Sequence, residues 1–357
     1  MTAATSTVAP LPVRVSRVVP VTVILVIALV VLGVLSAGSG QLAVPPDQVF
    51  GSVLHRIGLD WLALPTHPNG DAALWSIRFP RVAMAMLVGA ALATGGAVMQ
   101  GVFGNPLADP GVVGVSSGAA LAACTGIVFG LSFAGSYTTA LLAFIGGLIA
   151  TAGVYLLARS DGRTEVVTLV LTGVAVNAVG GAGIAFLTFL GDSQSREQIV
   201  FWQLGSLNGT RWSYVGVVAP LVAVGVLAAI LLARRLDLLA LGERSARHVG
   251  VDVERLRMAC IVVVALLTAA AVAFCGIISF VGLVVPHLIR MLLGPGHRVL
   301  VPLSALGGAV LLTGADLVAR TAVAYADLPI GMLTALVGGP FFFWLIRRTR
   351  RTAGGWA

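Results

Sequence analysis

The stretch VFGNPLADPGVVGVSSGAALAA, residues 102–123, interrupts an otherwise apolar chain with polar residues and prolines. Asn105, Pro106, Asp109 and Pro110 fall within it, and long runs of Ala, Val, Leu and Gly stand on both sides. Proline disfavours a helical conformation at the residue before it and is tolerated at the first position of a helix. The stretch therefore predicts that one apolar helix ends here, that a short loop follows, and that a second helix begins.

The composition decides the class of protein. Of the 357 residues, 58% are hydrophobic and 10% are charged, whereas charged residues make up about 25% of an average soluble domain. A helix that crosses the hydrocarbon core needs about 20 apolar residues, so the chain has room for about ten crossings. We therefore predict an all-α polytopic membrane protein with about ten transmembrane helices, in which residues 1–357 form a single transmembrane domain.

Apolar runs along the chain place these helices. The runs of spanning length are 18–36, 80–102, 112–131, 138–158, 166–190, 213–233, 257–277, 300–320 and 329–346. A shorter run, 279–293, contains Pro286, which should kink its helix without ending it. Within 80–102, Gly89, Ala93 and Ala97 recur at every fourth position and predict close packing against another helix.

The arginines support an even number of crossings. With the N-terminus inside, most arginines fall in the inner segments, as the positive-inside rule requires. We therefore predict a multi-pass protein of the cytoplasmic membrane with both termini in the cytoplasm. Two connections stand out: an outer loop at 37–79, in which 48–57 has the pattern of a short amphipathic helix, and an inner segment at 234–255.

The inner segment 234–255 mixes charged residues with apolar ones at helical spacing. The pattern predicts two short helices around Gly242 that lie beneath the bilayer. Two interpretations remain open from the pattern alone. The segment is either a helix on the membrane surface or a docking site for a soluble partner.

The basic residues exclude two function classes. The formal net charge is +8, and all 22 basic residues are arginine. A P-loop ATPase needs a lysine on the nucleotide phosphates, so this chain is not expected to be an enzyme that hydrolyses ATP. The arginines lie between apolar runs and do not form a polar face, so we expect a lipid bilayer and no nucleic acid as partner.

Other patterns point to structural roles. Residues 114–118, GVSSG, match the hydrolase elbow G-x-S-x-G but lack the strand that this motif follows. We interpret Ser116 and Ser117 as packing residues that bond back to carbonyl groups one turn earlier. The histidines form no metal-binding pair and the cysteines no CxxC motif, so no metal site is predicted.

Ionisable residues in apolar segments are functional candidates. His287 is one, with a hydrogen bond to a carbonyl freed by Pro286 as the structural alternative. Asp316 and Arg320 stand four residues apart and predict a salt bridge. A channel or an ion-coupled secondary transporter, the competing function class, normally has carboxylates in mid-membrane, and Asp316 is the candidate here.

The chain resembles the permease subunits of type II ABC importers for iron chelates, haem and cobalamin, the FecCD-type permeases. The stretches that carry the resemblance include RFPRVAMAML and NPLADPGVVGVSSGAALA within 78–122, FWQLGSLNGTRW at 201–212, LALGERSARHVGV at 239–251 and FVGLVVPHLIRMLLGPGHR within 276–346. The resemblance implies ten spans, a homodimer with a central path, two ATPase subunits inside and one extracytoplasmic substrate-binding protein. ATP and Mg²⁺ would bind the ATPase subunit, and this chain would bind no cofactor.

The resemblance also assigns roles to residues. It implies that docking of the binding protein uses Arg78, Arg81 and Arg320. It places an inner gate at Asn105, Pro106, Leu107 and Ala108, with a second gate segment at 164–167. It favours ATPase docking for the inner segment, with coupling residues Leu241, Gly242, Glu243, Arg244, Ala246, Arg247 and Gly250.

The substrate is the least constrained inference from the resemblance. The form of LADPGVVGVSSGAALA is closest to haem importers, so we expect haem, with an iron-siderophore or cobalamin as alternatives. Met84, Met86, Met99 and His287 are candidates for the translocation path. For the three methionines, packing in the core is the alternative.

Overall fold

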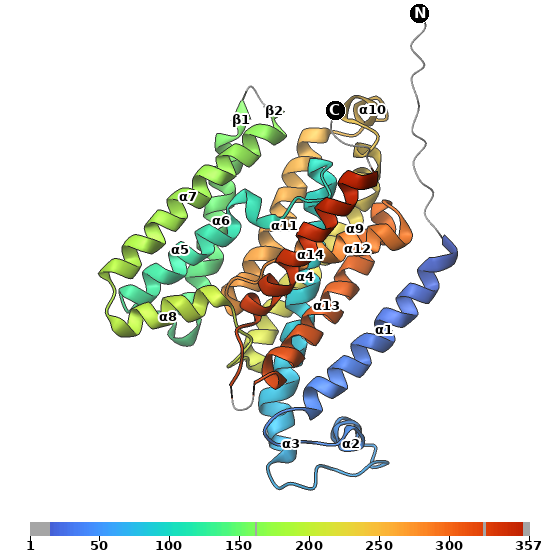
Figure 1. Cartoon of the computed structure of the whole chain (residues 1–357), viewed down its shortest axis with the longest axis vertical. Coiled ribbons are helices and arrows are strands. Elements are labelled where there is room, and N and C mark those ends of the chain that lie inside the picture. The colour runs from blue at the N-terminus through green and yellow to red at the C-terminus, as the bar shows by residue number, and fades with distance from the viewer. Residues whose placement is uncertain (1–14, 161–162, 324–325, 353–357) are drawn as a thin grey trace, which may run out of the picture.

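The computed structural model describes residues 15–160, 163–323 and 326–352. The chain forms an elongated bundle of helices (Figure 1). The longer helices are α1 (Val15–Gly38), α4 (Phe79–Phe103), α6 (Thr138–Leu157), α7 (Val166–Leu190), α9 (Trp212–Leu239), α11 (Val253–Cys275), α13 (His297–Thr321) and α14 (Ile330–Thr352).

Shorter elements connect and complete the bundle. The short α-helices are α2 (Pro46–Arg56), α3 (Gly70–Ala73), α5 (Val115–Val128), α8 (Ser193–Leu204), α10 (Glu243–His248) and α12 (Val281–Leu293). Single helical turns are η1 (Leu74–Arg78), η2 (Pro110–Val113) and η3 (Gly135–Tyr137). Strands β1 (Arg159–Ser160) and β2 (Arg163–Thr164) pair antiparallel as a small hairpin before α7.

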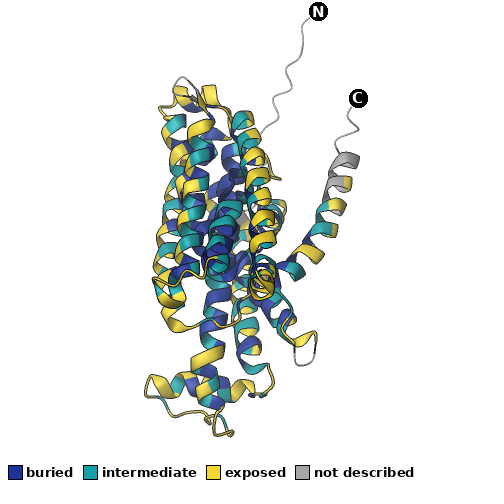
Figure 2. Ribbon diagram, turned by 90° about the vertical axis from the view of Figure 1, so that its left-hand side faces the viewer, coloured by how far each residue is buried: buried dark blue, intermediate teal, exposed yellow. Residues whose placement is uncertain are grey.

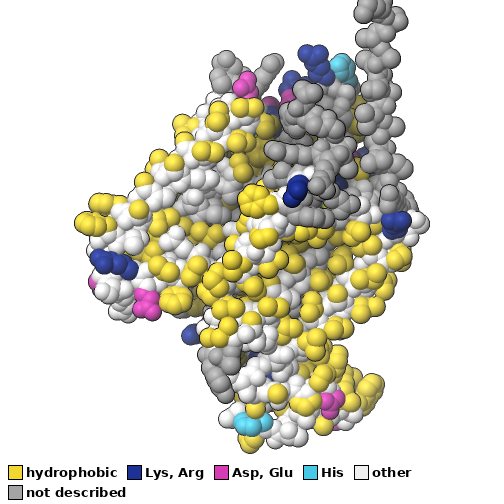
Figure 3. Space-filling view, in the orientation of Figure 1, with side chains coloured by type: hydrophobic (Ala, Val, Ile, Leu, Met, Phe, Trp, Pro, Cys, Tyr) yellow, Lys and Arg dark blue, Asp and Glu magenta, His cyan; other side chains and the backbone are white. Residues whose placement is uncertain are grey.

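The helical, membrane-spanning character of the chain is confirmed. Within the described residues, 7 helical segments are long and apolar enough to cross a membrane, and three shorter apolar helices are Val115–Val128, Val281–Leu293 and Ile330–Phe343. These positions match the predicted spans, and a total of ten requires that the three short helices also cross. Hydrophobic side chains cover the middle of the molecule, and charged ones gather toward its two ends (Figure 3).

The two ends of the bundle differ in their connections. One end carries α10 and the β1–β2 hairpin, and the other carries α2 and α3 (Figure 1). We call them the α10 end and the α2 end. The start of α1 and the end of α14 both lie at the α10 end. This arrangement is the one that an even number of crossings produces.

Helices α4 and α11 form the centre of the bundle. In the most apolar stretches of these two segments 78% and 72% of the residues are buried, whereas in α1 the fraction is 0%. Figure 2 shows the buried residues gathered inside the bundle and α14 leaning away from it. The core therefore depends on α4 and α11, and α1 lies at the periphery.

Glycine allows α4 to touch its neighbours backbone to backbone. A Cβ atom at Gly89 would lie 2.1 Å from the carbonyl oxygen of Gly308 in α13, and a Cβ at Gly96 would lie 1.8 Å from that of Gly282 in α12. Small residues permit such close approach in lipid, where little else drives helices together. The close packing predicted from Gly89, Ala93 and Ala97 is confirmed, since a Cβ at Gly308 would also lie 2.5 Å from the Cβ of Ala93.

Two expectations about the connections have different outcomes. The short helix predicted at 48–57 is confirmed as α2. The pair of short helices predicted around Gly242 is wrong, because α9 continues to Leu239 and only α10 is separate. The reason is that Leu236 and Leu239 are buried against the bundle, so burial of this apolar face favours continuation of α9. Gly242, which has a φ of 101°, then turns the chain between α9 and α10.

Replacement of Gly89 by alanine should destabilise the bundle. The added methyl group would meet the Gly308 carbonyl and force α4 and α13 apart, at a cost of about 1–3 kcal/mol. The matched control is Gly153→Ala in α6, where a Cβ would meet nothing within 4 Å. Thermal unfolding of the purified chain in detergent should show a lower midpoint for Gly89→Ala alone. Equal midpoints for the two variants would contradict the proposed contact.

Candidate functional site

The stretch that interrupts the apolar chain forms the loop between α4 and η2, as predicted. Helix α4 ends at Phe103 and is capped by Gly104, which has the left-handed φ of 58°. The side-chain oxygen of Asn105 accepts a hydrogen bond from the Leu107 N–H at 2.9 Å. Of the predicted inner gate, Asn105, Pro106 and Leu107 are exposed and Ala108 is buried. We call residues 104–109 the gate loop.

Asp109 ends the gate loop and caps η2. Its carboxylate accepts a hydrogen bond from the Gly111 N–H at 2.8 Å. Burial raises the pKa of this carboxyl group, and the hydrogen bond from Gly111 opposes that shift. The carboxyl group is therefore held by the backbone turn that starts the next helical segment.

Helix α7 holds the turn after the gate loop. The side-chain NH₂ of Asn177 donates to the Gly111 carbonyl at 3.2 Å, and its oxygen accepts from the Ser117 hydroxyl at 2.7 Å. One turn earlier, a Cβ at Gly173 would lie 1.7 Å from the carbonyl oxygen of Val112. The prediction that Ser117 bonds back within its own helix is wrong, because Asn177 offers its hydroxyl a partner on the neighbouring helix.

The predicted coupling segment is exposed at the α10 end. Leu241 is 60% exposed, and Arg244 and Arg247 also face outward, while Ala246 is fully buried beneath them. Glu243 begins α10 and pairs with Arg247 at 3.4 Å. The outward face of α10 therefore combines an apolar side chain with charged ones.

Glu243 also reaches the interior of the bundle. Its carboxylate accepts from a terminal nitrogen of Arg257, in α11, at 2.7 Å. The same guanidinium group donates to the carbonyl group of Thr164, which is the last residue of β2 and the first residue of the predicted second gate segment. That segment continues into α7, which begins at Val166. In that segment Thr164 is buried and Val167 is 68% exposed. Arg257 was not predicted from the sequence, because its only signal is a charge near the start of an apolar helix.

A cavity of about 480 Å³ joins these segments at the α10 end. Its lining includes Pro106 of the gate loop, Val166 of α7 and Gly242 before α10, together with Arg290 and His297. The Nδ1 atom of His297 lies 2.9 Å from a carboxylate oxygen of Asp237. The structure thus brings both predicted gate segments and the predicted coupling segment to one cavity.

The three arginines assigned to the outer face lie at the α2 end. Arg78 is 7% exposed. Its guanidinium donates to the carbonyl groups of Ala37 at 2.8 Å and Gly38 at 3.2 Å, and also to that of Leu42. The side chain therefore fastens the end of α1 to the start of α4.

Arg81 and Arg320 meet at one carboxylate. The Nε atom of Arg81 donates to Asp316 at 3.0 Å, and Nε of Arg320 lies 3.2 Å from the other oxygen of the same carboxylate. Arg81 also pairs with Asp327 at 2.7 Å, and Arg320 donates to the Ser36 carbonyl at 2.7 Å. The predicted Asp316–Arg320 salt bridge is confirmed. We call Arg81, Asp316 and Arg320 the outer ion cluster.

These contacts bear on the predicted roles of the charged residues. The guanidinium groups of Arg78, Arg81 and Arg320 are already engaged within the chain, so contact with a binding protein would require them to share or exchange partners. Their docking role stays a prediction. Asp316 is 0% exposed and is paired with two arginines, so its charge is neutralised inside the chain.

The candidates for the translocation path lie mostly in the packing. Met84 and Met99 are fully buried. Met86 is partly buried and directs its terminal methyl group toward Gly33 of α1. His287 is partly buried, and its Nδ1 atom has no hydrogen-bond partner among the residues that the structure describes. The structure thus favours the packing alternative for the methionines, and among the described residues it does not contain the hydrogen bond from His287 to a carbonyl that was the structural alternative.

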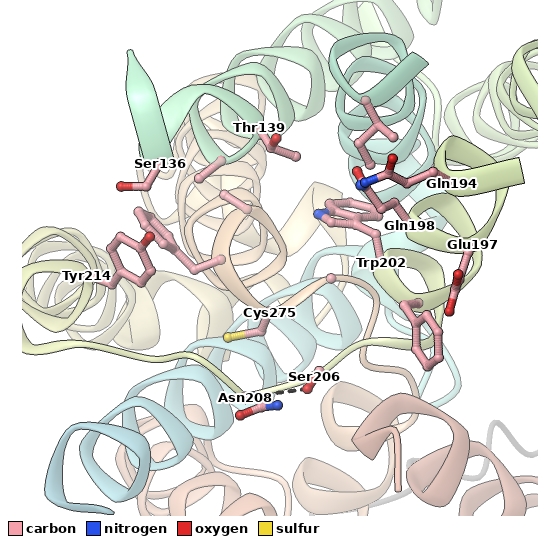
Figure 4. A pocket seen from close by; sticks show the side chains of 16 residues that line it. Ser136, Thr139, Gln194, Glu197, Gln198, Trp202, Ser206, Asn208, Tyr214 and Cys275 are labelled. Atoms are coloured by element: carbon pink, nitrogen blue, oxygen red, sulfur yellow. Dashed lines mark hydrogen bonds between the residues drawn. The ribbon is translucent and has the colours of Figure 1, made fainter. Parts of the chain in front are cut away.

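A second cavity, of about 610 Å³, opens beside α8. Gln194, Glu197, Gln198 and Trp202 of α8 face it, and Tyr214 of α9 lies across from them (Figure 4). The sequence stretch FWQLGSLNGTRW, which contributes Trp202, Ser206 and Asn208, was recognised only as part of the resemblance. Its amide, hydroxyl and aromatic groups give the cavity a mixed polar and aromatic wall.

Comparisons with known proteins place this architecture. Residues 27–348 match the FecCD transport family. The chain is 42% identical to the hemin transport system permease protein HmuU of Yersinia pestis, over 93% of this chain and 96% of that protein. It is 41% identical to the cobalamin import system permease protein BtuC of Halobacterium salinarum, over 86% of each.

A solved structure agrees with these matches. The structure of a metal-chelate type ABC transporter in an inward-facing conformation superimposes with a TM-score of 0.81 at 31% identity, and covers 92% of this chain and 99% of that one. The bundle and its ends are those of an ABC importer permease. The chain belongs to the FecCD transport family, as the resemblance in the sequence indicated.

The contact between α7 and the turn after the gate loop gives a test of gating. Gly173→Ala should push the Val112 carbonyl away from α7 and reduce substrate uptake by the assembled importer several-fold. Gly153→Ala in α6 is the control, because a Cβ there would meet nothing within 4 Å. Uptake into membrane vesicles measures both. Equal uptake by the two variants would show that this contact does not serve transport.

The outer ion cluster predicts a large loss of stability. Asp316→Asn would leave Arg320 without a carboxylate partner in the interior and Arg81 with Asp327 alone, and removal of one partner of a buried pair costs about 3–5 kcal/mol. The control is Asp47→Asn on α2, where the side chain is exposed. Thermal unfolding in detergent should separate the two variants clearly. A midpoint for Asp316→Asn near that of the parent would refute a structural role of the cluster.

Proposed function

We propose that this chain is one half of a homodimeric permease that imports haem across the cytoplasmic membrane. Two ATPase subunits would dock at the α10 end, which is then cytoplasmic, and a substrate-binding protein at the α2 end. ATP and Mg²⁺ would bind the ATPase subunits. The chain itself would carry out no covalent chemistry.

The orientation is supported by the exposed charged face of α10. A membrane protein with its arginine-rich connections inside follows the positive-inside rule, and Arg244 and Arg247 of α10 are both exposed at this end. Leu241 adds an exposed apolar anchor beside them. These features suit a soluble partner that presents an acidic and apolar groove.

Pairing of two copies is supported by a stripe of small residues on α7. Ala175, Ala178, Ala182 and Ala185 are exposed and recur at the spacing of one helix face. Small side chains let helix backbones approach closely in lipid. A second copy of α7 on this face would place the two gate loops on either side of a common axis.

The substrate proposal rests on one observation, the match to the hemin permease over nearly the whole length of both chains. Cobalamin is the second candidate, because the match to a cobalamin permease is almost as strong. Both substrates are large, flat macrocycles, so the same path chemistry would suit either. The choice between them therefore needs a transport experiment.

The mechanism that we propose is alternating access. Closure of the ATPase pair would displace α10, and this displacement would reach the gate loop and the segment before α7 around the shared cavity of about 480 Å³. Packed helices tend to switch between discrete arrangements and do not deform continuously. The glycine contacts of α4 would keep the centre of the bundle intact while its α10 end opens.

Growth with defined iron sources tests the substrate. Cells that lack this chain should fail to grow with haem as the sole iron source and should grow normally with ferrous iron. Reintroduction of the chain should restore growth on haem. Uptake of radiolabelled haem and of radiolabelled cobalamin by the same cells compares the two candidates directly. Loss of cobalamin uptake with intact haem uptake would overturn the haem proposal and support cobalamin.

A further inference from the structure

Arg257 is buried although it lies at the α10 end, where other arginines are exposed. Its side chain is 2% exposed, whereas that of Arg255, two residues earlier on α11, is 85% exposed and pairs with Asp252 on the surface. A buried guanidinium has lost its water and needs partners within the protein. Arg257 therefore depends on the groups that contact it within the chain.

Three segments meet at the Arg257 guanidinium. One terminal nitrogen donates to Glu243, the first residue of α10, at 2.7 Å. The other donates to Glu254 of α11 at 3.0 Å and to the Thr164 carbonyl of β2 at 2.5 Å. The remaining oxygen of Glu254 accepts from the Thr164 N–H at 3.1 Å. Thr164 is thus held by both its N–H and its carbonyl group.

Because of the position of Thr164, these bonds connect the starts of two helices. Thr164 is the last residue of the β1–β2 hairpin, and α7 begins two residues later at Val166. Glu243 begins α10. One side chain therefore connects the start of the coupling helix to the start of the helix that holds Gly111 and Ser117 after the gate loop.

The competing ion pair of Glu243 is weaker and stays within α10. Glu243 also pairs with Arg247 of the same helix, but at 3.4 Å and with both side chains about half exposed. Exposed pairs of this kind contribute little because water competes for both charges. The fork of an arginine can hold two partners at fixed angles, which the single ammonium group of a lysine cannot reproduce.

We propose that Arg257 is the positioning residue that transmits displacement of α10 to the start of α7. When α10 moves, Glu243 carries the guanidinium group with it, and the bonds to Thr164 carry the hairpin. The inference rests on the proposed function, because it assumes that an ATPase subunit moves α10. It goes further by naming the side chain through which that motion leaves the coupling segment.

Thiol labelling at Val167 tests the inference without reference to the substrate. Cys124, Cys260 and Cys275 are all buried, so an added Val167→Cys thiol at the exposed start of α7 should dominate reaction with a maleimide. The assembled importer, purified with its ATPase subunits and placed in lipid, would be labelled with and without ATP and vanadate. In the parent, nucleotide should change the labelling rate by about fivefold or more, within the range of allosteric couplings.

Arg257→Lys should abolish most of this nucleotide effect while the ATPase subunits remain bound and still hydrolyse ATP. Arg255→Lys, on the exposed side of the same helix, is the matched control and should retain the full effect. Glu243→Gln provides a second variant in case Arg257→Lys fails to fold, because Glu243 is half exposed; it should weaken the effect. A purely structural role would instead lower assembly and hydrolysis together.

Two results would overturn the inference in distinguishable ways. If Arg257→Lys or, where that variant does not fold, Glu243→Gln keeps the nucleotide effect of the parent, the transmitting role of Arg257 is refuted and the proposed function stands. If no ATPase co-purifies with the parent, or nucleotide has no effect on Val167→Cys in the parent, the ATP-driven function and the inference both fail.

Discussion

Charge buried in this bundle has to be neutralised within the chain, and this constraint fixes the α2 end. The Asp316 carboxylate is fully buried between Arg81 of α4 and Arg320 of its own helix. Lipid offers no water to an unpaired charge, so loss of one partner strands the others in a medium of low dielectric constant. Helices α4 and α13 therefore cannot slide past each other without breaking the cluster, and the glycine contacts between them are held in register.

At the α10 end a buried charge is likewise paired within the chain, but its partner is more exposed to solvent. Arg257 is as buried as Asp316, but its partner Glu243 is half exposed and stands at the start of a short helix. Glu243 and Arg257 can move together because Glu243 faces solvent. The bundle thus combines a fixed α2 end and a tightly packed centre with an α10 end where the start of α10, the gate loop and the start of α7 share one cavity.

The sequence predicted the class of protein, most helix positions and the loop at residues 104–109, because apolar run length and proline position are local signals. It could not predict that Arg81 pairs with Asp316, because Asp316 lies 235 residues further along the chain. Arg257 gave no signal for a similar reason, since Thr164 is brought to it by the fold. The arginines assigned to the outer face illustrate the limit: they lie together at the α2 end, but their burial depends on neighbours that a pattern does not reveal.

The peripheral position of α1 has a consequence for biogenesis. The first helix leaves the ribosome early, and Arg78 can bond the carbonyl groups at its far end soon afterwards, whereas the second side chain that holds this end, Arg320, lies 284 residues beyond the Ser36 carbonyl that it contacts. The attachments of α1 to α4 and to α13 therefore form at opposite stages of synthesis. Docking of α1 on α13 can occur only once the chain has been made as far as α13.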